Sequence, residues 1–138
     1  GVTADNIYSV MDKMAVEDTD NCSLSVDTRF CGTRREPDIK GAILQITEDN
    51  FTPQQLTRGF LMGMCRELYA FYEQMEKLTG DKRTHLVGSG NGVRKNKILQ
   101  HYLEETFKMP LEIPANTEEA AFGAAVFVSR NLKNKITG

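Results

Sequence analysis

The chain has 138 residues, of which 40% are hydrophobic and 26% are charged, a composition typical of one water-soluble globular domain. Its formal net charge of −2 provides no strong field for nucleic acid or for an anionic membrane, so neither is an expected partner. No apolar run approaches the roughly 20 residues that span a bilayer, and the N-terminus lacks the pattern of a signal peptide, so we expect a cytoplasmic protein.

The first third of the chain predicts one helix and two short strands. Apolar residues recur at three- and four-residue spacing over residues 3 to 16, which indicates an amphipathic helix. The acidic residues of 17 to 21 have no apolar neighbours and are typical of a solvated loop. Apolar stretches at 24 to 26 and 42 to 46 predict two strands, joined by an arginine-containing loop over 27 to 41.

A long helix is predicted from Pro53. Thr52 and Gln55 have the spacing of a capping box, proline is favoured at the first helical position, and Gly80 is a typical C-terminal stop. One apolar face is expected to run along the helix and to be buried. It consists of Leu56, Phe60, Met64, Leu68, Phe71, Met75 and Leu78.

Gly59 and Gly63 lie four residues apart on this helix, where each costs about 1 kcal/mol of helix propensity relative to alanine. We interpret them as positions where another element packs closely, with approach of a ligand as the alternative. Cys65 is expected to be buried. The three cysteines of the chain form no Cys-x-x-Cys motif and leave one unpaired in any disulfide scheme, so reduced thiols are expected.

The last third of the chain predicts the order strand, helix, strand, helix. The strands are expected at 84 to 87 and 111 to 113, with a helix from about residue 94 between them, and this order usually means parallel pairing. Asn116 and Glu119 have capping-box spacing and open a final helix whose small residues permit close packing. In the helix predicted from about residue 94, the residues expected to face inward are Ile98, Leu99, Tyr102, Leu103 and Phe107.

A glycine-rich turn connects the strand at 84 to 87 to the helix that follows. Gly88, Gly90 and Gly92 lack the Cβ atoms that would keep a phosphate or ribose away from the backbone, and the start of a helix offers free N–H groups. Val93 replaces the last glycine of G-x-G-x-x-G, and no Gly-Lys-Ser/Thr ending makes the turn a P-loop. A tight turn without a ligand is the alternative.

The order of these motifs resembles the C-terminal end of the FGGY family of carbohydrate kinases. The similar segments are the glycine-rich turn at 88 to 92, the segment Met-Pro-Leu-Glu-Ile-Pro at 109 to 114, and Glu-Glu-Ala-Ala-Phe-Gly-Ala-Ala at 118 to 125. Upstream, the loop of 27 to 41 is similar to the family's Gly-x-Arg-x-x-Pro loop. The resemblance covers most of residues 24 to 130.

The resemblance implies an α/β fold, namely the incomplete C-terminal part of an actin-like, ribonuclease-H-like ATPase domain. Residues 1 to 138 are then the nucleotide-binding portion of a kinase that transfers the γ-phosphate of ATP to a sugar hydroxyl, with Mg²⁺. In the family the catalytic base and most of the sugar pocket lie in the N-terminal domain, which has no match here. No catalytic residue or metal ligand is therefore expected in this chain, which alone should be inactive.

The resemblance also implies where ATP or ADP contacts the chain. The expected nucleotide-binding residues are Gly88, Ser89, Gly90, Asn91, Arg94 and Lys95. Asn96 falls near the adenine side, and Lys97 or Gln100 is a candidate for a ribose or purine edge. Arg34 and Arg35 either contact phosphate or pair with acidic neighbours of the same loop, Glu36 or Asp38.

The family members most similar to this sequence imply a ketose such as sedoheptulose as the sugar substrate. Xylulose, glycerol and gluconate are the alternatives within the family, and a homodimer is an open possibility. A different class of function is a non-catalytic, actin-like module for partner binding or oligomerisation, against which the three glycines of the turn argue.

Overall fold

A computed structural model describes residues 9, 10, 13, 23–115 and 118–136. The predicted loop at 17 to 21, the cap at Asn116 and most of the predicted helix at 3 to 16 lie outside these residues. The described elements are β1 (Ser25–Asp27), β2 (Ala42–Leu44), α2 (Pro53–Thr79), β3 (Leu86–Val87), α3 (Asn91–Lys95), α4 (Lys97–Phe107), β4 (Leu111–Glu112) and α5 (Glu119–Ile136).

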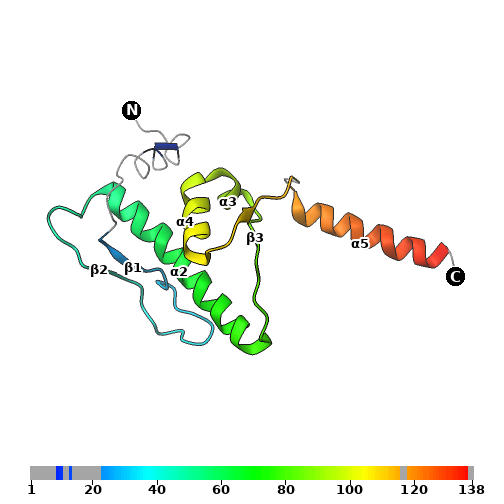
Figure 1. Ribbon diagram of the computed structural model, residues 1–138, viewed down its shortest axis with the longest axis horizontal. Helices are drawn as coiled ribbons and strands as arrows, with labels where there is room; N and C mark the ends of the chain where they lie inside the picture. The colour runs from blue at the N-terminus through cyan, green and yellow to red at the C-terminus, as the bar shows by residue number, and fades with distance from the viewer. Residues whose placement is uncertain (1–8, 11–12, 14–22, 116–117, 137–138) are drawn as a thin grey trace.

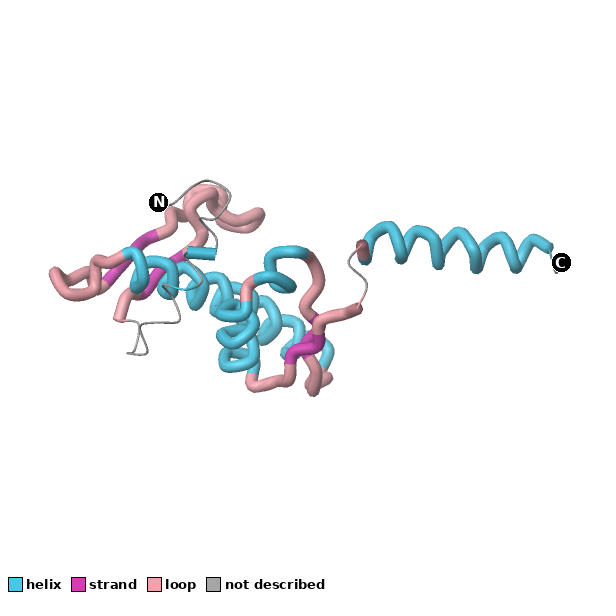
Figure 2. Tube along the Cα trace, turned by 90° about the horizontal axis from the view of Figure 1, so that it is seen from above, coloured by secondary structure: helices cyan, strands magenta, loops and turns pink. Residues whose placement is uncertain are grey.

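The long helix α2 lies at the centre of the fold. β1 and β2 lie along one side of it, and α4 packs against another, while α5 projects away from the rest of the chain (Figure 1). Seen at a right angle, α5 again extends away from the body of the molecule (Figure 2). Among the described residues, no helix is both long and apolar enough to cross a membrane.

The ends of α2 are as the sequence predicts. The Gln55 N–H donates to Oγ1 of Thr52 at 3.2 Å, so threonine caps the first turn. At the other end Gly80 has φ +73° and its N–H donates to the Glu76 carbonyl at 2.8 Å. These local bonds stabilise both ends of the helix without help from distant parts of the chain.

The predicted strands near residues 24 and 42 are confirmed as an antiparallel pair in which Val26 faces Ile43. The two helix glycines lie under β1. A Cβ atom added to Gly63 would lie 2.5 Å from the Val26 carbonyl oxygen, and one added to Gly59 would lie 2.8 Å from Cγ2 of Val26. Close packing of the strand is therefore the reason for both glycines, as interpreted from the sequence.

The predicted buried face of α2 is wrong over most of its length. Its last five apolar positions are exposed, from 41% at Met64 to 86% at Leu78. β1 and α4 approach the helix along other faces, so no described element covers these side chains. We call this exposed set the α2 stripe. It consists of Met64, Leu68, Phe71, Met75 and Leu78.

The core lies between α2 and α4. Cys65, Leu99, Leu103 and Phe107 form its buried cluster, which confirms the inward face predicted for the helix after the glycine-rich turn. Tyr69 packs edge-on against Phe107 with ring centroids 5.3 Å apart. Burial raises the pKa of the Cys65 thiol to about 11, so the group is a protonated packing residue.

The C-terminal strands pair in parallel, as the order of elements predicts, with Leu86 opposite Leu111. The single helix expected from about residue 94 is instead two helices. α3 already begins at Asn91, and the chain breaks at Asn96, whose side-chain oxygen accepts the Leu99 N–H at 2.8 Å and caps α4. Because an asparagine cap starts a new helix, α3 ends after five residues and α4 begins at Lys97.

α5 differs from its prediction in its surroundings. The sequence predicts close packing by its small residues, but Phe122, Phe127 and Val128 are more than half exposed. In Figure 2, α5 extends away from the other described elements, which therefore do not cover these side chains.

Candidate functional site

The glycine-rich turn is held tightly against β4 at its first residue. Gly88 is buried, and its N–H donates to the Glu112 carbonyl at 2.9 Å. A Cβ atom on Gly88 would lie 2.8 Å from Cγ1 of Val93 and 2.9 Å from Cδ1 of Ile113. This glycine is therefore required by the packing under the turn.

The outer side of the turn is open. Gly90 has φ +94°, a conformation that favours glycine, and an added Cβ atom would meet no atom of the described residues within 4 Å. Gly92 is equally open, and Ser89 and Asn91 are exposed. Since the first N–H groups of a helix have no carbonyl partner inside it, the start of α3 offers donors toward this open space.

Arg94 and Glu119 tie the turn to the beginning of α5. Nη2 of Arg94 donates to Oε1 of Glu119 at 2.6 Å, and its Nη1 donates to the Pro114 carbonyl at 2.7 Å. The two side chains are only 20% and 26% exposed. The backbone N–H of Glu119 itself, the Arg94 guanidinium and the Gly90 N–H stabilise the charged carboxylate and lower the pKa of Glu119.

This arrangement gives Arg94 and Glu119 a positioning role that the sequence did not predict. The sequence placed Arg94 near the nucleotide and gave Glu119 only a capping-box spacing with Asn116. In the structure one guanidinium fixes three segments around the turn: α3, the residues after β4, and α5.

Two further polar residues near the turn serve the helix junction. Nε2 of Gln100 donates to the carbonyls of Val93 at 2.7 Å and Arg94 at 3.2 Å. Lys97 donates to Oε1 of Gln100 at 3.2 Å, while Lys95 remains exposed. Of the predicted residues, the structure therefore brings Gly88 to Asn91 together on the turn and places Arg94 and Lys95 at the end of α3.

Glu119→Gln is expected to abolish the change in the Gly90 amide resonance that accompanies protonation of Glu119 at acidic pH. In the wild type, protonation of Glu119 removes its charged interaction with Arg94 and Gly90, so the Gly90 amide resonance should shift with a midpoint below the usual glutamate pKa of 4.5. Because the pKa of Glu119 is lowered in the folded state, its contact with Arg94 stabilises the fold at pH values above the usual glutamate pKa. This stabilisation is lost as the pH falls through the lowered pKa of the folded state.

An NMR pH titration of the Gly90 amide tests this expectation. The matched control is Glu118→Gln, which changes the exposed neighbouring carboxylate and should leave the transition intact. A Gly90 shift that persists unchanged in Glu119→Gln would show that another group is responsible.

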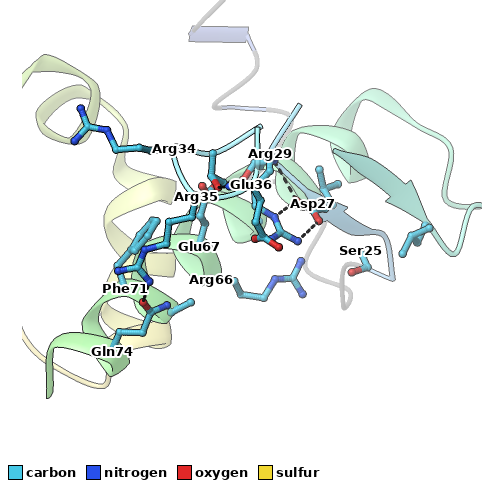
Figure 3. Close-up of a pocket in the computed structure, with 16 residues that line it drawn as sticks. Ser25, Asp27, Arg29, Arg34, Arg35, Glu36, Arg66, Glu67, Phe71 and Gln74 are labelled. Carbon is cyan, nitrogen blue, oxygen red and sulfur yellow. Dashed lines mark hydrogen bonds and ion pairs between the residues drawn. The ribbon is translucent and has the colours of Figure 1, made fainter. Parts of the chain in front are cut away.

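In the loop of 27 to 41, Glu36 and Arg35 have partners other than those that the sequence suggested. Glu36 lies 3.7 Å from Arg29 rather than pairing with Arg34 or Arg35. Nη1 of Arg35 instead donates to Oε1 of Gln74 on α2 at 3.3 Å (Figure 3).

Comparison with known proteins adds to this geometry. Residues 3–132 match the model of the FGGY family of carbohydrate kinases, C-terminal domain. Over 136 residues the chain is 23% identical to human sedoheptulokinase and 28% identical to the mouse protein, covering 97% of this chain. The chain spans about 28% of the length of each of these relatives.

Solved structures show the same fold. Xylulose kinase from Bifidobacterium adolescentis superposes with a TM-score of 0.72 at 24% identity, and Plasmodium falciparum glycerol kinase with ADP superposes with a TM-score of 0.75 at 20% identity. Each match covers 86% of this chain and 24% of the other. The predicted α/β, actin-like fold class is thereby confirmed. The chain belongs to the FGGY family of carbohydrate kinases, in which it corresponds to the C-terminal domain.

Proposed function

We propose that this chain is the ATP-binding C-terminal portion of a carbohydrate kinase that transfers the γ-phosphate of ATP to a sugar hydroxyl. The observation that carries the proposal is the open glycine-rich turn, where Gly90 has φ +94° and an added Cβ atom has no neighbour within 4 Å in the part of the chain that the structure describes. The glycerol kinase with a similar fold was solved with ADP, which supports a nucleotide as the ligand.

The turn would position the nucleotide through its backbone. Gly88, Ser89, Gly90 and Asn91 would pass beneath the α-phosphate and ribose. The N–H groups of Gly88 and Gly90 are bonded to Glu112 and Glu119, so other N–H groups at the start of α3 would meet the negative charge. In this proposal Arg94 acts through its bonds to Pro114 and Glu119, which fix the turn, and the exposed Lys95 faces the adenine side. Mg²⁺ would accompany ATP and neutralise phosphate charge during transfer.

The catalytic base, the sugar pocket and the ligands of the magnesium ion would lie in other segments of the intact protein. The described residues contain no cluster of three or more acidic, histidine or cysteine side chains suited to a metal ion. The α2 stripe supports further segments, because several exposed large apolar side chains on one helix face are typical of an interface. We place the intact enzyme in the cytoplasm, with a homodimer as one candidate partner for this face.

Sedoheptulose is the proposed sugar, which the intact enzyme would convert to sedoheptulose 7-phosphate. The similarity to human and mouse sedoheptulokinase supports it, whereas the fold is also that of xylulose and glycerol kinases. The test is ADP release by the intact enzyme with ATP and each of sedoheptulose, xylulose, glycerol and gluconate. The highest kcat/KM is expected with sedoheptulose; a higher value with another sugar would reassign the substrate.

A further inference from the structure

Asn91 and Gly92 form an asparagine–glycine pair at the start of α3, on the open side of the glycine-rich turn. It is the one place in the sequence where glycine follows asparagine. Because glycine has no Cβ atom, the Gly92 nitrogen can approach the side chain of the preceding residue with little steric hindrance. Attack of a main-chain nitrogen on an asparagine side chain is therefore least hindered at this pair.

The Asn91 side chain is exposed and makes no hydrogen bond to the part of the chain that the structure describes. Asn50 is the opposite case, since it is only 7% exposed. Its Oδ1 accepts the Thr47 N–H at 2.8 Å, and its Nδ2 donates to the Gln45 carbonyl at 2.8 Å. These bonds hold the amide of Asn50 in place, whereas the amide of Asn91 is free to turn toward the next nitrogen.

The first turn of α3 is weakly held. The helix has five residues, none of which is buried, and its N-cap Gly90 offers no side-chain bond. The Gly92 N–H lies at the second helical position, where the helix has no carbonyl to accept it. So short a helix opens at low cost, and opening lets the backbone rotate until the Gly92 nitrogen reaches Cγ of Asn91.

We propose that Asn91 is a site of spontaneous deamidation. The Gly92 nitrogen gives its proton to solvent hydroxide, and its electron pair forms a bond to Cγ of Asn91. The bond from Cγ to the side-chain nitrogen breaks, and ammonia leaves with a proton taken from water. A water molecule then opens the resulting succinimide ring. It adds either to Cγ, which gives aspartate, or to the main-chain carbonyl carbon, which gives isoaspartate.

The product adds a negative charge to the turn, and isoaspartate also lengthens the main chain by one carbon. The reaction itself is independent of any nucleotide. Its consequence rests on the function proposed above, in which Asn91 passes beneath the α-phosphate, because the new carboxylate would repel that phosphate. Asn91→Asp, which carries the same charge, is therefore expected to lower the affinity for ATP about tenfold.

Peptide mapping of the folded 138-residue chain, before and after incubation in mildly alkaline buffer, tests the proposal. Trypsin releases residues 84 to 94, in which Asn91 is the one side-chain amide, so exchange of its NH₂ for OH changes the peptide mass. The deamidated form should accumulate faster as the pH rises, because hydroxide removes the Gly92 proton.

Two glycine variants identify the attacking nitrogen. Gly92→Ala should slow the reaction at Asn91 about tenfold or more, because the new Cβ atom hinders that nitrogen and alanine stabilises the helix. Gly123→Ala is the matched control. It also places a methyl group on a helical glycine with open surroundings, and the rate at Asn91 should not change.

Three mapping results would overturn the proposal. These are an unchanged mass for residues 84 to 94, conversion of Asn50 as fast as that of Asn91, and an equal rate in the wild type and Gly92→Ala. A separate ATP titration of Asn91→Asp tests the consequence for the turn. Unchanged ATP affinity would contradict the proposed place of the nucleotide, whereas the mapping result does not depend on where the nucleotide binds.

Discussion

Phe107→Ala is expected to lower the free energy of unfolding by about 3 to 5 kcal/mol, the usual cost of removing a buried aromatic ring. Phe107 is 8% exposed and belongs to the cluster with Cys65, Leu99 and Leu103. Its ring also contacts Tyr69 and Tyr72, with centroids 5.3 and 5.7 Å away. Removing it leaves a cavity at the contact between α2 and α4.

Urea unfolding followed by circular dichroism measures this change. Phe51→Ala is the control, because Phe51 is 58% exposed and its truncation should change stability by only about 0.5 kcal/mol. Similar losses for the two variants would mean that the packing of α4 on α2 does not dominate the stability of the domain.

Gly63→Ala is expected to destabilise the protein by about 1 to 3 kcal/mol, although alanine is the better helix former. The new Cβ atom would lie 2.5 Å from the Val26 carbonyl oxygen and 3.1 Å from Cγ2 of Thr28. The closer neighbour is backbone and cannot rotate away, so β1 must move from α2.

Gly123→Ala provides the comparison for this substitution. It is also a helical glycine, but an added Cβ atom there meets no described atom within 4 Å. Its stability should be unchanged or slightly raised in the same unfolding measurement. A Gly63→Ala variant as stable as Gly123→Ala would contradict the close approach of β1 to α2.

The sequence predicted those features that depend on neighbouring residues. Thr52, Pro53 and Gly80 fix the ends of α2 through bonds within a few positions, and all three were interpreted correctly. The parallel pairing of β3 with β4 follows from the helical connection between them, since parallel strands need a long crossover. The glycine-rich turn was likewise located from its own residues.

The features that the sequence missed depend on distant partners. Periodicity showed that α2 is amphipathic, but only the positions of β1 and α4 decide which side chains are covered, so the α2 stripe was wrongly expected to be buried. Arg94 and Glu119 are 25 positions apart, and nothing local indicates that they pair. The break at Asn96 did have a local signal, an asparagine directly before an apolar helical pattern.

The measurement that tests the account most directly is a calorimetric titration of the 138-residue chain with ATP and ADP, with and without Mg²⁺. It compares the wild type with Gly90→Val and with Gly80→Val, since both glycines have positive φ and open surroundings but only Gly90 lies on the turn. The account predicts equal nucleotide affinity in the wild type and Gly80→Val, and affinity lower by about tenfold or more in Gly90→Val. Equal affinity in all three folded proteins would contradict a nucleotide on the glycine-rich turn and would favour a non-catalytic binding module.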